Sequence, residues 1–190
     1  GIDSAMVAVL SLDRQALQEA CRRASHLGVV SIANYNCPGQ LVIAGQREAV
    51  EQAAAFAREL GARRTMPLKT SGPFHTKLLE PASRALHAYF QTIPFGSMRF
   101  PVLFNYLGDV MGAEDTIPAL LEKQVMSSVY MEDSIRRMGQ MGVDTFVEIG
   151  PGKVLSGFVR KTLDQAKTYS VTTPEELEAA ATELKGAATC

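Results

Sequence analysis

The first part of the chain alternates short apolar runs with amphipathic stretches. Four runs rich in apolar and β-branched residues predict strands at residues 5–10, 29–36, 41–45 and 62–68. Between them, residues 12–27 and 46–60 carry apolar side chains at helical spacing, and Asp13 is placed to cap the first helix. The order β-α-β-β-α-β is that of the ferredoxin-like fold, so we predict a ferredoxin-like small domain over residues 5–68.

Residues 69–190 show a different pattern, in which helices alternate with strands. Helical spacing covers residues 78–91, 117–129, 131–142 and 151–163, and strand-like runs cover residues 101–106 and 144–150. A last strand and helix fall within residues 168–184, where Thr173 and Glu176 have the spacing of a capping box. This alternation predicts α/β structure with parallel strands. Because the strands are few for a buried parallel sheet, we expect this region to be the trailing part of a larger sheet.

Composition narrows the class of protein. Hydrophobic residues make up 46% and charged residues 21% of the chain, as in globular proteins with a packed core. The net charge of −1 and the absence of a long apolar run argue against nucleic acid and membrane partners. The cysteines (Cys21, Cys37 and Cys190) are odd in number and lack metal-site spacing, which favours a reducing, cytoplasmic location.

The histidine in "LKTSGPFHTKLLEPA" is the main candidate for chemistry. His75 lies in a loop between a predicted strand and a predicted helix, next to Gly72 and Pro73. No histidine or cysteine stands at metal-ligand spacing from it, so a metal site is disfavoured. A general base and a structural turn residue both fit this position. The chain contains no G-x-S-x-G motif, so a base would have no evident serine nucleophile among these residues.

Four segments carry a resemblance to a known family: "YNCPGQLVIAG", "GPFHTKLLEPA", "LEKQVMSSVYMEDSI" and "FVEIGPGKVLSGFVRK". In their order and spacing they resemble the malonyl-CoA:acyl carrier protein transacylases of fatty-acid synthesis and the related acyltransferase domains of polyketide synthases. The resemblance implies an α/β-hydrolase-like large domain into which a ferredoxin-like small domain is inserted. Residues 5–68 would then be the insert, and residues 69–190 the C-terminal part of the large domain.

The resemblance also implies roles for individual residues. His75 falls on the family's catalytic base, and Gln124 on the residue whose backbone carbonyl orients that histidine. Asn34 and Asn36 match a strand end near the substrate. Phe74 matches the bulky residue associated with the choice of malonyl over methylmalonyl groups. Malonyl-CoA is the expected substrate, and no bound cofactor is expected.

Partners follow from the same resemblance. The acidic acyl carrier protein would dock on basic side chains, for which Arg63, Arg64 and Lys153 are candidates. A preceding N-terminal segment would supply the serine elbow and the carboxylate-binding arginine, so we expect no malonyl transfer by this chain alone. Two alternatives remain open from the sequence: a non-catalytic ferredoxin-like binding module in which His75 is structural, and a hydrolase that uses the same half-site.

Overall fold

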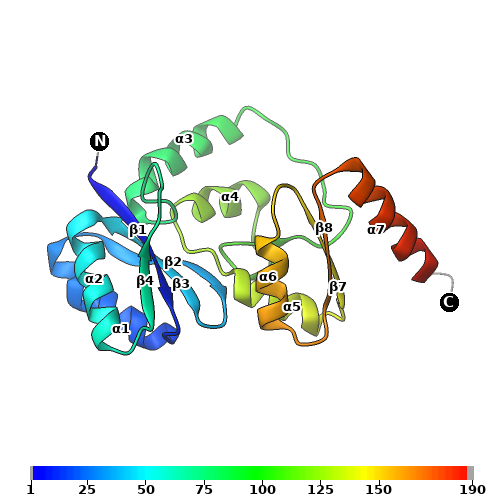
Figure 1. Cartoon of the computed structure of the whole chain (residues 1–190). Coiled ribbons are helices and arrows are strands. Elements are labelled where there is room, and N and C mark those ends of the chain that lie inside the picture. Colours follow the sequence, from blue (N-terminus) through cyan, green and yellow to red (C-terminus); the bar gives the residue numbers. More distant parts are fainter. Residues whose placement is uncertain (1, 188–190) are drawn as a thin grey trace. The chain divides into compact units, whose positions relative to one another are not determined.

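The computed structural model describes residues 2–187, and Cys190 lies outside this range (Figure 1). Helices and strands alternate through the described chain, which confirms the mixed α/β class expected from the sequence. Packing divides the chain into two compact units, the first ending at Ser134 and the second beginning at Ile135. The boundary after residue 68 that the sequence suggested stays a prediction. No helix within residues 2–187 is both long enough and apolar enough to cross a bilayer.

The first unit begins with a four-stranded sheet. Its strands are β1 (Ser4–Leu10), β2 (Val30–Cys37), β3 (Gln40–Gln46) and β4 (Arg64–Pro67). They are antiparallel and lie side by side in the order β2-β3-β1-β4. Two helices, α1 (Arg14–Ala24) and α2 (Arg47–Glu59), complete the β-α-β-β-α-β order, with a 3-10 turn η1 (Ser25–Leu27) after α1. Every strand and helix predicted between residues 5 and 68 is therefore present.

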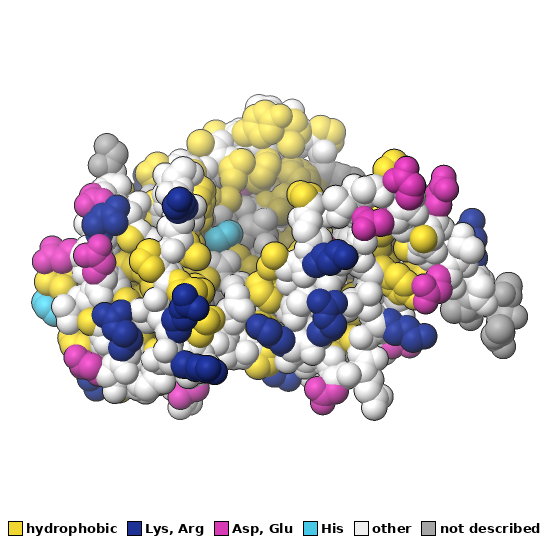
Figure 2. Space-filling view, in the orientation of Figure 1, with side chains coloured by type: hydrophobic (Ala, Val, Ile, Leu, Met, Phe, Trp, Pro, Cys, Tyr) yellow, Lys and Arg dark blue, Asp and Glu magenta, His cyan; other side chains and the backbone are white. Residues whose placement is uncertain are grey.

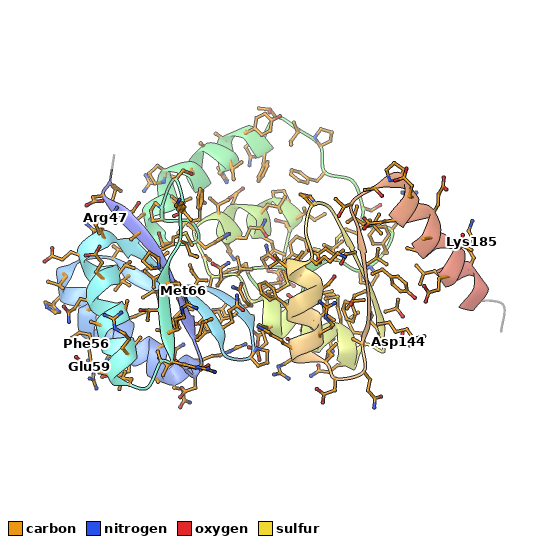
Figure 3. The ribbon with its side chains drawn as sticks, viewed as in Figure 1. Arg47, Phe56, Glu59, Met66, Asp144 and Lys185 are labelled. Carbon is orange, nitrogen blue, oxygen red and sulfur yellow. The ribbon has the colours of Figure 1, made fainter. Side chains whose placement is uncertain are left out.

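Alternation along the strands explains how this sheet buries both faces. Val7 and Val9 of β1 point into the larger core, which also contains the buried faces of α1 and α2. The intervening residues Met6 and Ala8 point to the other face, where the side chains are mostly small and Met66 of β4 packs against them (Figure 3). Helix α1 begins as predicted, since the Asp13 carboxylate accepts a hydrogen bond of 2.8 Å from the Ala16 amide.

The remainder of the first unit consists of helices and one short strand pair, joined by loops. Its elements are η2 (Lys77–Leu79), α3 (Glu80–Phe90), β5 (Leu103–Phe104), β6 (Asp109–Val110) and α4 (Ile117–Val125). The strand predicted over residues 101–106 is only two residues long, and it forms an antiparallel pair with β6. Helix α5 (Met131–Gln140) starts at the end of this unit.

The helix predicted over residues 117–129 is too long by four residues. Helix α4 ends at Val125, and the chain beyond it runs extended along the edge strand β2. The Val129 amide donates to the Ala33 carbonyl at 2.8 Å, and the Val129 carbonyl accepts from the Tyr35 amide at 2.9 Å. Backbone hydrogen bonds with an exposed sheet edge replace those of another helical turn, and a β-branched valine suits the extended backbone.

The second unit contains β7 (Thr145–Ile149), α6 (Val154–Thr162), β8 (Lys167–Val171) and α7 (Pro174–Ala187). Strands β7 and β8 are parallel, as the alternation of strands and helices predicted. The predicted capping box is also present: the Glu176 amide donates to Thr173 Oγ1 at 3.3 Å, and the Thr173 amide donates to the Glu176 carboxylate at 3.2 Å.

Candidate active site

His75 occupies an unusual backbone conformation at the end of the loop that leaves β4. Its φ angle is +61°, in the left-handed region that few non-glycine residues adopt. The next residue, Thr76, is buried and anchors the loop: its hydroxyl donates to the Pro73 carbonyl at 2.7 Å and accepts from the Leu78 amide at 3.3 Å. The half-buried His75 ring is thereby held on a backbone that is fixed on both sides.

The His75 ring is oriented by a backbone carbonyl. Its Nδ1 lies 2.9 Å from the carbonyl oxygen of Gln124, near the C-terminal end of α4. Because a carbonyl oxygen can only accept, Nδ1 carries the hydrogen and Nε2 of the neutral ring is left with a free electron pair. The hydrogen bond that the family resemblance implied is thus present, and the catalytic roles of the two residues are taken up below as a proposal.

Helix α4 is itself fastened to α3 through Glu122. Ser83 Oγ on α3 donates to the Glu122 carbonyl at 2.9 Å. His87, one turn further along α3, approaches the Glu122 carboxylate with a distance of 3.0 Å between Nδ1 and Oε2. These contacts lie two residues before Gln124, so they fix the part of α4 that presents the carbonyl to His75.

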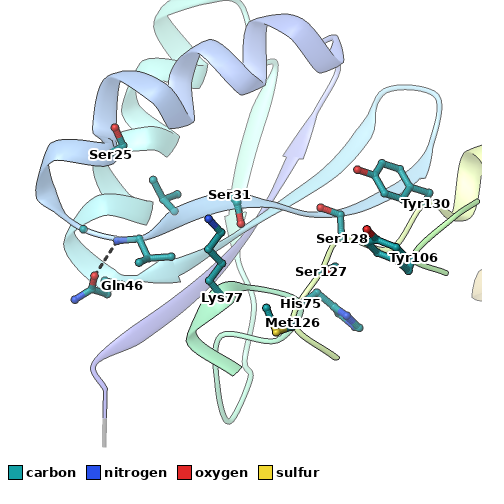
Figure 4. Close-up of a pocket in the computed structure, with 13 residues that line it drawn as sticks. Ser25, Ser31, Gln46, His75, Lys77, Tyr106, Met126, Ser127, Ser128 and Tyr130 are labelled. Carbon is teal, nitrogen blue, oxygen red and sulfur yellow. Dashed lines mark hydrogen bonds between the residues drawn. The ribbon is translucent and has the colours of Figure 1, made fainter. Parts of the chain in front are cut away.

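A cleft of about 750 Å³ lies beside His75 (Figure 4). It is bounded by the residues that lead into β2, by the start of η2, and by the extended segment after α4. Its polar lining includes Ser31, Ser127, Ser128 and Tyr106, together with the His75 ring. This volume is within the range of small-molecule and cofactor sites.

Lys77 is a lining residue that the sequence analysis did not select. Its side chain enters the cleft from the first residue of η2, two positions after His75. The only signal in the sequence was the short separation from His75 in "FHTK", which does not by itself say to which side the lysine points.

One wall of the cleft is tied to α1 by a cluster of charged and aromatic side chains. Tyr130, which lines the cleft, stacks on Tyr35 of β2 with ring centroids 4.9 Å apart. The Arg14 guanidinium lies over the Tyr35 ring and forms ion pairs with Glu132 at 3.1 Å and Asp133 at 2.9 Å. The segment that follows Gln124 is therefore held against the sheet by side chains as well as by its backbone.

The other residues selected from the sequence lie outside the lining of this cleft. Asn34 and Asn36 are half-buried on β2, where Asn34 forms a bridge with Val129. The Phe74 side chain, next to His75 in the loop, is 42% exposed.

The basic residues selected for carrier docking are all exposed. Arg63 precedes β4 and Arg64 begins it, both in the first unit, while Lys153 precedes α6 in the second. Figure 2 shows other basic side chains spread over the visible surface, with acidic ones among them. A surface of this kind does not single out one docking patch.

The described residues offer no evident metal centre. No group of three or more histidine, cysteine or carboxylate side chains comes together among residues 2–187. Cys21 and Cys37 are buried, and burial raises the pKa of the Cys21 thiol to about 12. A thiol of this kind is protonated at neutral pH, which is unsuited to a nucleophile or a metal ligand.

Comparison with known proteins finds similarity to malonyl CoA-acyl carrier protein transacylases. No protein-family model matches the chain. It is 42% identical over 184 residues to the malonyl CoA-acyl carrier protein transacylase of Bacillus subtilis strain 168, an alignment that covers 96% of this chain and 58% of that protein. The Haemophilus influenzae protein of the same name is 38% identical over 169 residues, which are 88% of this chain and 54% of that protein.

Solved structures agree with the sequence matches. The malonyl CoA-acyl carrier protein transacylase of Clostridium perfringens aligns with a TM-score of 0.93 and 38% identity, covering 100% of this chain and 59% of that one. The malonyl-transacylase solved in complex with a type II polyketide acyl-carrier protein aligns with a TM-score of 0.89 and 32% identity, over 94% of this chain and 58% of that one. The chain spans less than two thirds of the length of these relatives. Over most of its length it is therefore similar to part of the malonyl CoA-acyl carrier protein transacylases.

Proposed function

We propose that this chain supplies the general base for transfer of a malonyl group from malonyl-CoA to the phosphopantetheine thiol of acyl carrier protein. The observation that carries the proposal is the hydrogen bond between His75 Nδ1 and the Gln124 carbonyl, at the edge of a cleft of suitable size. It leaves Nε2 as the free acceptor on a ring whose backbone is fixed. The similarity to transacylases suggests the reaction, and the geometry of His75 suggests the residue that acts as the base.

In the first half of the proposed reaction, a serine outside these 190 residues attacks the thioester carbonyl of malonyl-CoA. His75 Nε2 takes the serine proton as the new ester bond forms. The imidazolium then gives that proton to the departing coenzyme A thiolate. Malonyl-serine remains, and His75 is neutral again.

In the second half, His75 takes the proton of the carrier thiol, and the resulting thiolate attacks the malonyl-serine ester. The serine oxygen leaves and recovers the proton from His75. The Gln124 carbonyl stabilises the imidazolium in both halves by accepting the Nδ1 hydrogen, without the charge that an aspartate would bring.

The proposal extends to the fold and to the binding residues. Strand order β2-β3-β1-β4 with two helices supports a ferredoxin-like small domain at residues 5–68, and residues 69–190 would belong to an α/β-hydrolase-like large domain. Phe74 would exclude a methylmalonyl group by its bulk, and Asn34 and Asn36 would lie near the substrate. Arg63, Arg64 and Lys153 would receive the carrier protein, and the location would be cytoplasmic.

The test is a malonyl-transfer assay on the chain in two forms: by itself, and joined to the part of the Bacillus subtilis relative that it does not match. Labelled malonyl-CoA and purified acyl carrier protein are supplied, and malonyl-carrier and free malonate are measured separately. We expect the joined form to transfer malonyl groups, and His75→Ala to lower kcat/KM by about 10²–10⁴-fold. His26→Ala, which removes an exposed histidine outside the cleft, is the matched control.

The outcomes separate the alternatives. Equal rates for the joined form with and without the His75 imidazole would overturn its role as the base. Release of free malonate without malonyl-carrier would favour a hydrolase. Neither product from a folded joined form would favour a binding module in which His75 is structural.

A further inference from the structure

Lys77 places a cation in the cleft without an acidic partner. No salt bridge or hydrogen bond involves its ammonium group within residues 2–187. Among the described residues that line the cleft, none is an aspartate or a glutamate. Lys77 is exposed, so its ammonium group is accessible to an anionic group of a ligand.

The surroundings of Lys77 fit an extended ligand with an anionic end. In Figure 4 the Lys77 side chain extends towards the end of β2 that carries Ser31, whereas the His75 ring points away from it. The hydroxyl group of Ser31 provides a hydrogen-bond donor on that side. Val29, Val30 and Met126 add apolar surface to the lining between polar groups. The cation of the cleft therefore lies on a side that is separate from the imidazole.

The separation between the Lys77 ammonium group and the His75 imidazole indicates which anionic group of a substrate Lys77 could bind. The acyl group reacts at His75 in the proposed mechanism, so its carboxylate would have to stay near the imidazole. In a phosphopantetheine chain the phosphate lies at the opposite end from the thiol, with an uncharged arm between them. We propose that Lys77 binds the phosphate of the phosphopantetheine arm, an inference that rests on the proposed function and names a further binding residue for it.

The test is equilibrium binding of four small molecules to the 190-residue chain by titration calorimetry at fixed low salt. They are 4′-phosphopantetheine, pantetheine, malonate and inorganic phosphate. We expect phosphopantetheine to bind about tenfold or more tightly than pantetheine, which lacks only the phosphate. Lys77→Met should remove this preference, and Lys77→Arg should keep most of it. Lys69→Met is the control, because Lys69 is an exposed lysine in the loop before η2 and does not line the cleft.

Three results would overturn the inference: equal affinity for phosphopantetheine and pantetheine, a phosphate preference that survives Lys77→Met, or dependence on Lys77 for malonate alone. The comparison of the two pantetheine compounds needs no variant, so it decides the matter even where Lys77→Met fails to fold. Binding of phosphopantetheine does not depend on the serine nucleophile of the proposed reaction. A phosphate preference without malonyl transfer would thus overturn only the proposed function, and transfer without the preference would overturn only this inference.

Discussion

The Gln124 carbonyl oxygen lies 2.9 Å from Nδ1 of His75, across 49 positions of the sequence. The partner of the imidazole is thus a main-chain atom at the end of a helix, whose place depends on the packing of that helix. The side chain of Gln124 has no part in this contact.

Replacing the Gln124 side chain should leave the His75 tautomer unchanged. In Gln124→Ala the carbonyl remains, so Nδ1 should stay protonated and Nε2 should stay an acceptor. Nitrogen-15 chemical shifts of the imidazole report the tautomer directly, and His26 in the same spectrum serves as an internal reference. A shift of the proton from Nδ1 to Nε2 in the variant would show that the glutamine side chain is required.

Loss of the Ser83 hydroxyl should lower the free energy of unfolding, because it removes a contact between α3 and α4. Ser83→Ala removes the donor to the Glu122 carbonyl, which lies in the last turn of the helix, where helical carbonyls lack partners of their own. We expect the free energy of unfolding to fall by about 1 kcal/mol, measured by urea titration with circular dichroism. Ser97→Ala, at an exposed loop position, should change it by less than about 0.5 kcal/mol. Equal effects of the two substitutions on the free energy of unfolding would argue against a stabilising role for the hydrogen bond between Ser83 of α3 and Glu122 of α4.

Arg14 should contribute more to stability than other arginines of its helix. Arg14→Met removes ion pairs to Glu132 and Asp133, and Glu132 is only 8% exposed. We expect a loss of about 2 kcal/mol, below the cost of breaking a fully buried pair because Arg14 is partly exposed. Arg22→Met breaks exposed pairing with Glu19 on the same helix and should cost less than about 0.5 kcal/mol. The urea titration compares the two variants, and similar losses would contradict the prediction.

The start of α7 should weaken in acid because of Glu176. Hydrogen bonds from the Thr172 and Thr173 amides lower the pKa of this carboxyl group below its usual value of 4.5. A lowered pKa in the folded state means that the stabilisation is complete above the usual pKa and is lost as the pH falls through the folded-state value. Hydrogen-exchange protection of the Thr172 and Thr173 amides, corrected for intrinsic rates, should therefore decline below about pH 4.5.

Glu176→Gln should remove this component of the pH dependence, since an amide does not titrate. Glu178→Gln, two residues further along the helix, should leave it unchanged. A decline of the same size in the Glu176 variant would assign the acid sensitivity to another group.

The left-handed backbone at position 75 should discriminate among substitutions. Asparagine tolerates φ near +60°, whereas a β-branched side chain does not. We expect His75→Val to be less stable than His75→Asn by about 1–2 kcal/mol, measured by urea titration. Equal stability would mean that the loop changes its conformation when the imidazole is removed.

Local chemistry in the sequence was sufficient for most of the secondary structure. Asp13 before a helical pattern and the Thr173–Glu176 spacing each marked a helix start, because a cap is made within three or four residues. The period of apolar residues identified the four strands and two helices of residues 5–68, because that period is also a local property of the chain. The loop around His75 was also evident, since glycine and proline punctuate the chain locally.

Tertiary structure decided what depends on distant partners. Helix α4 stops at Val125 because the residues after it bond to β2, and the Ser128 hydroxyl reaches the Ile32 carbonyl across 96 positions. Nothing in the sequence of residues 117–129 indicates that β2 is the hydrogen-bonding partner of the segment after α4. The direction of Lys77 into the cleft was likewise undetermined, because a short 3-10 turn sets where its side chain points. The sequence by itself determined most of the elements and marked His75 as a candidate for chemistry. The pairing of the His75 ring with a helix-end carbonyl was implied by family resemblance and is made by packing.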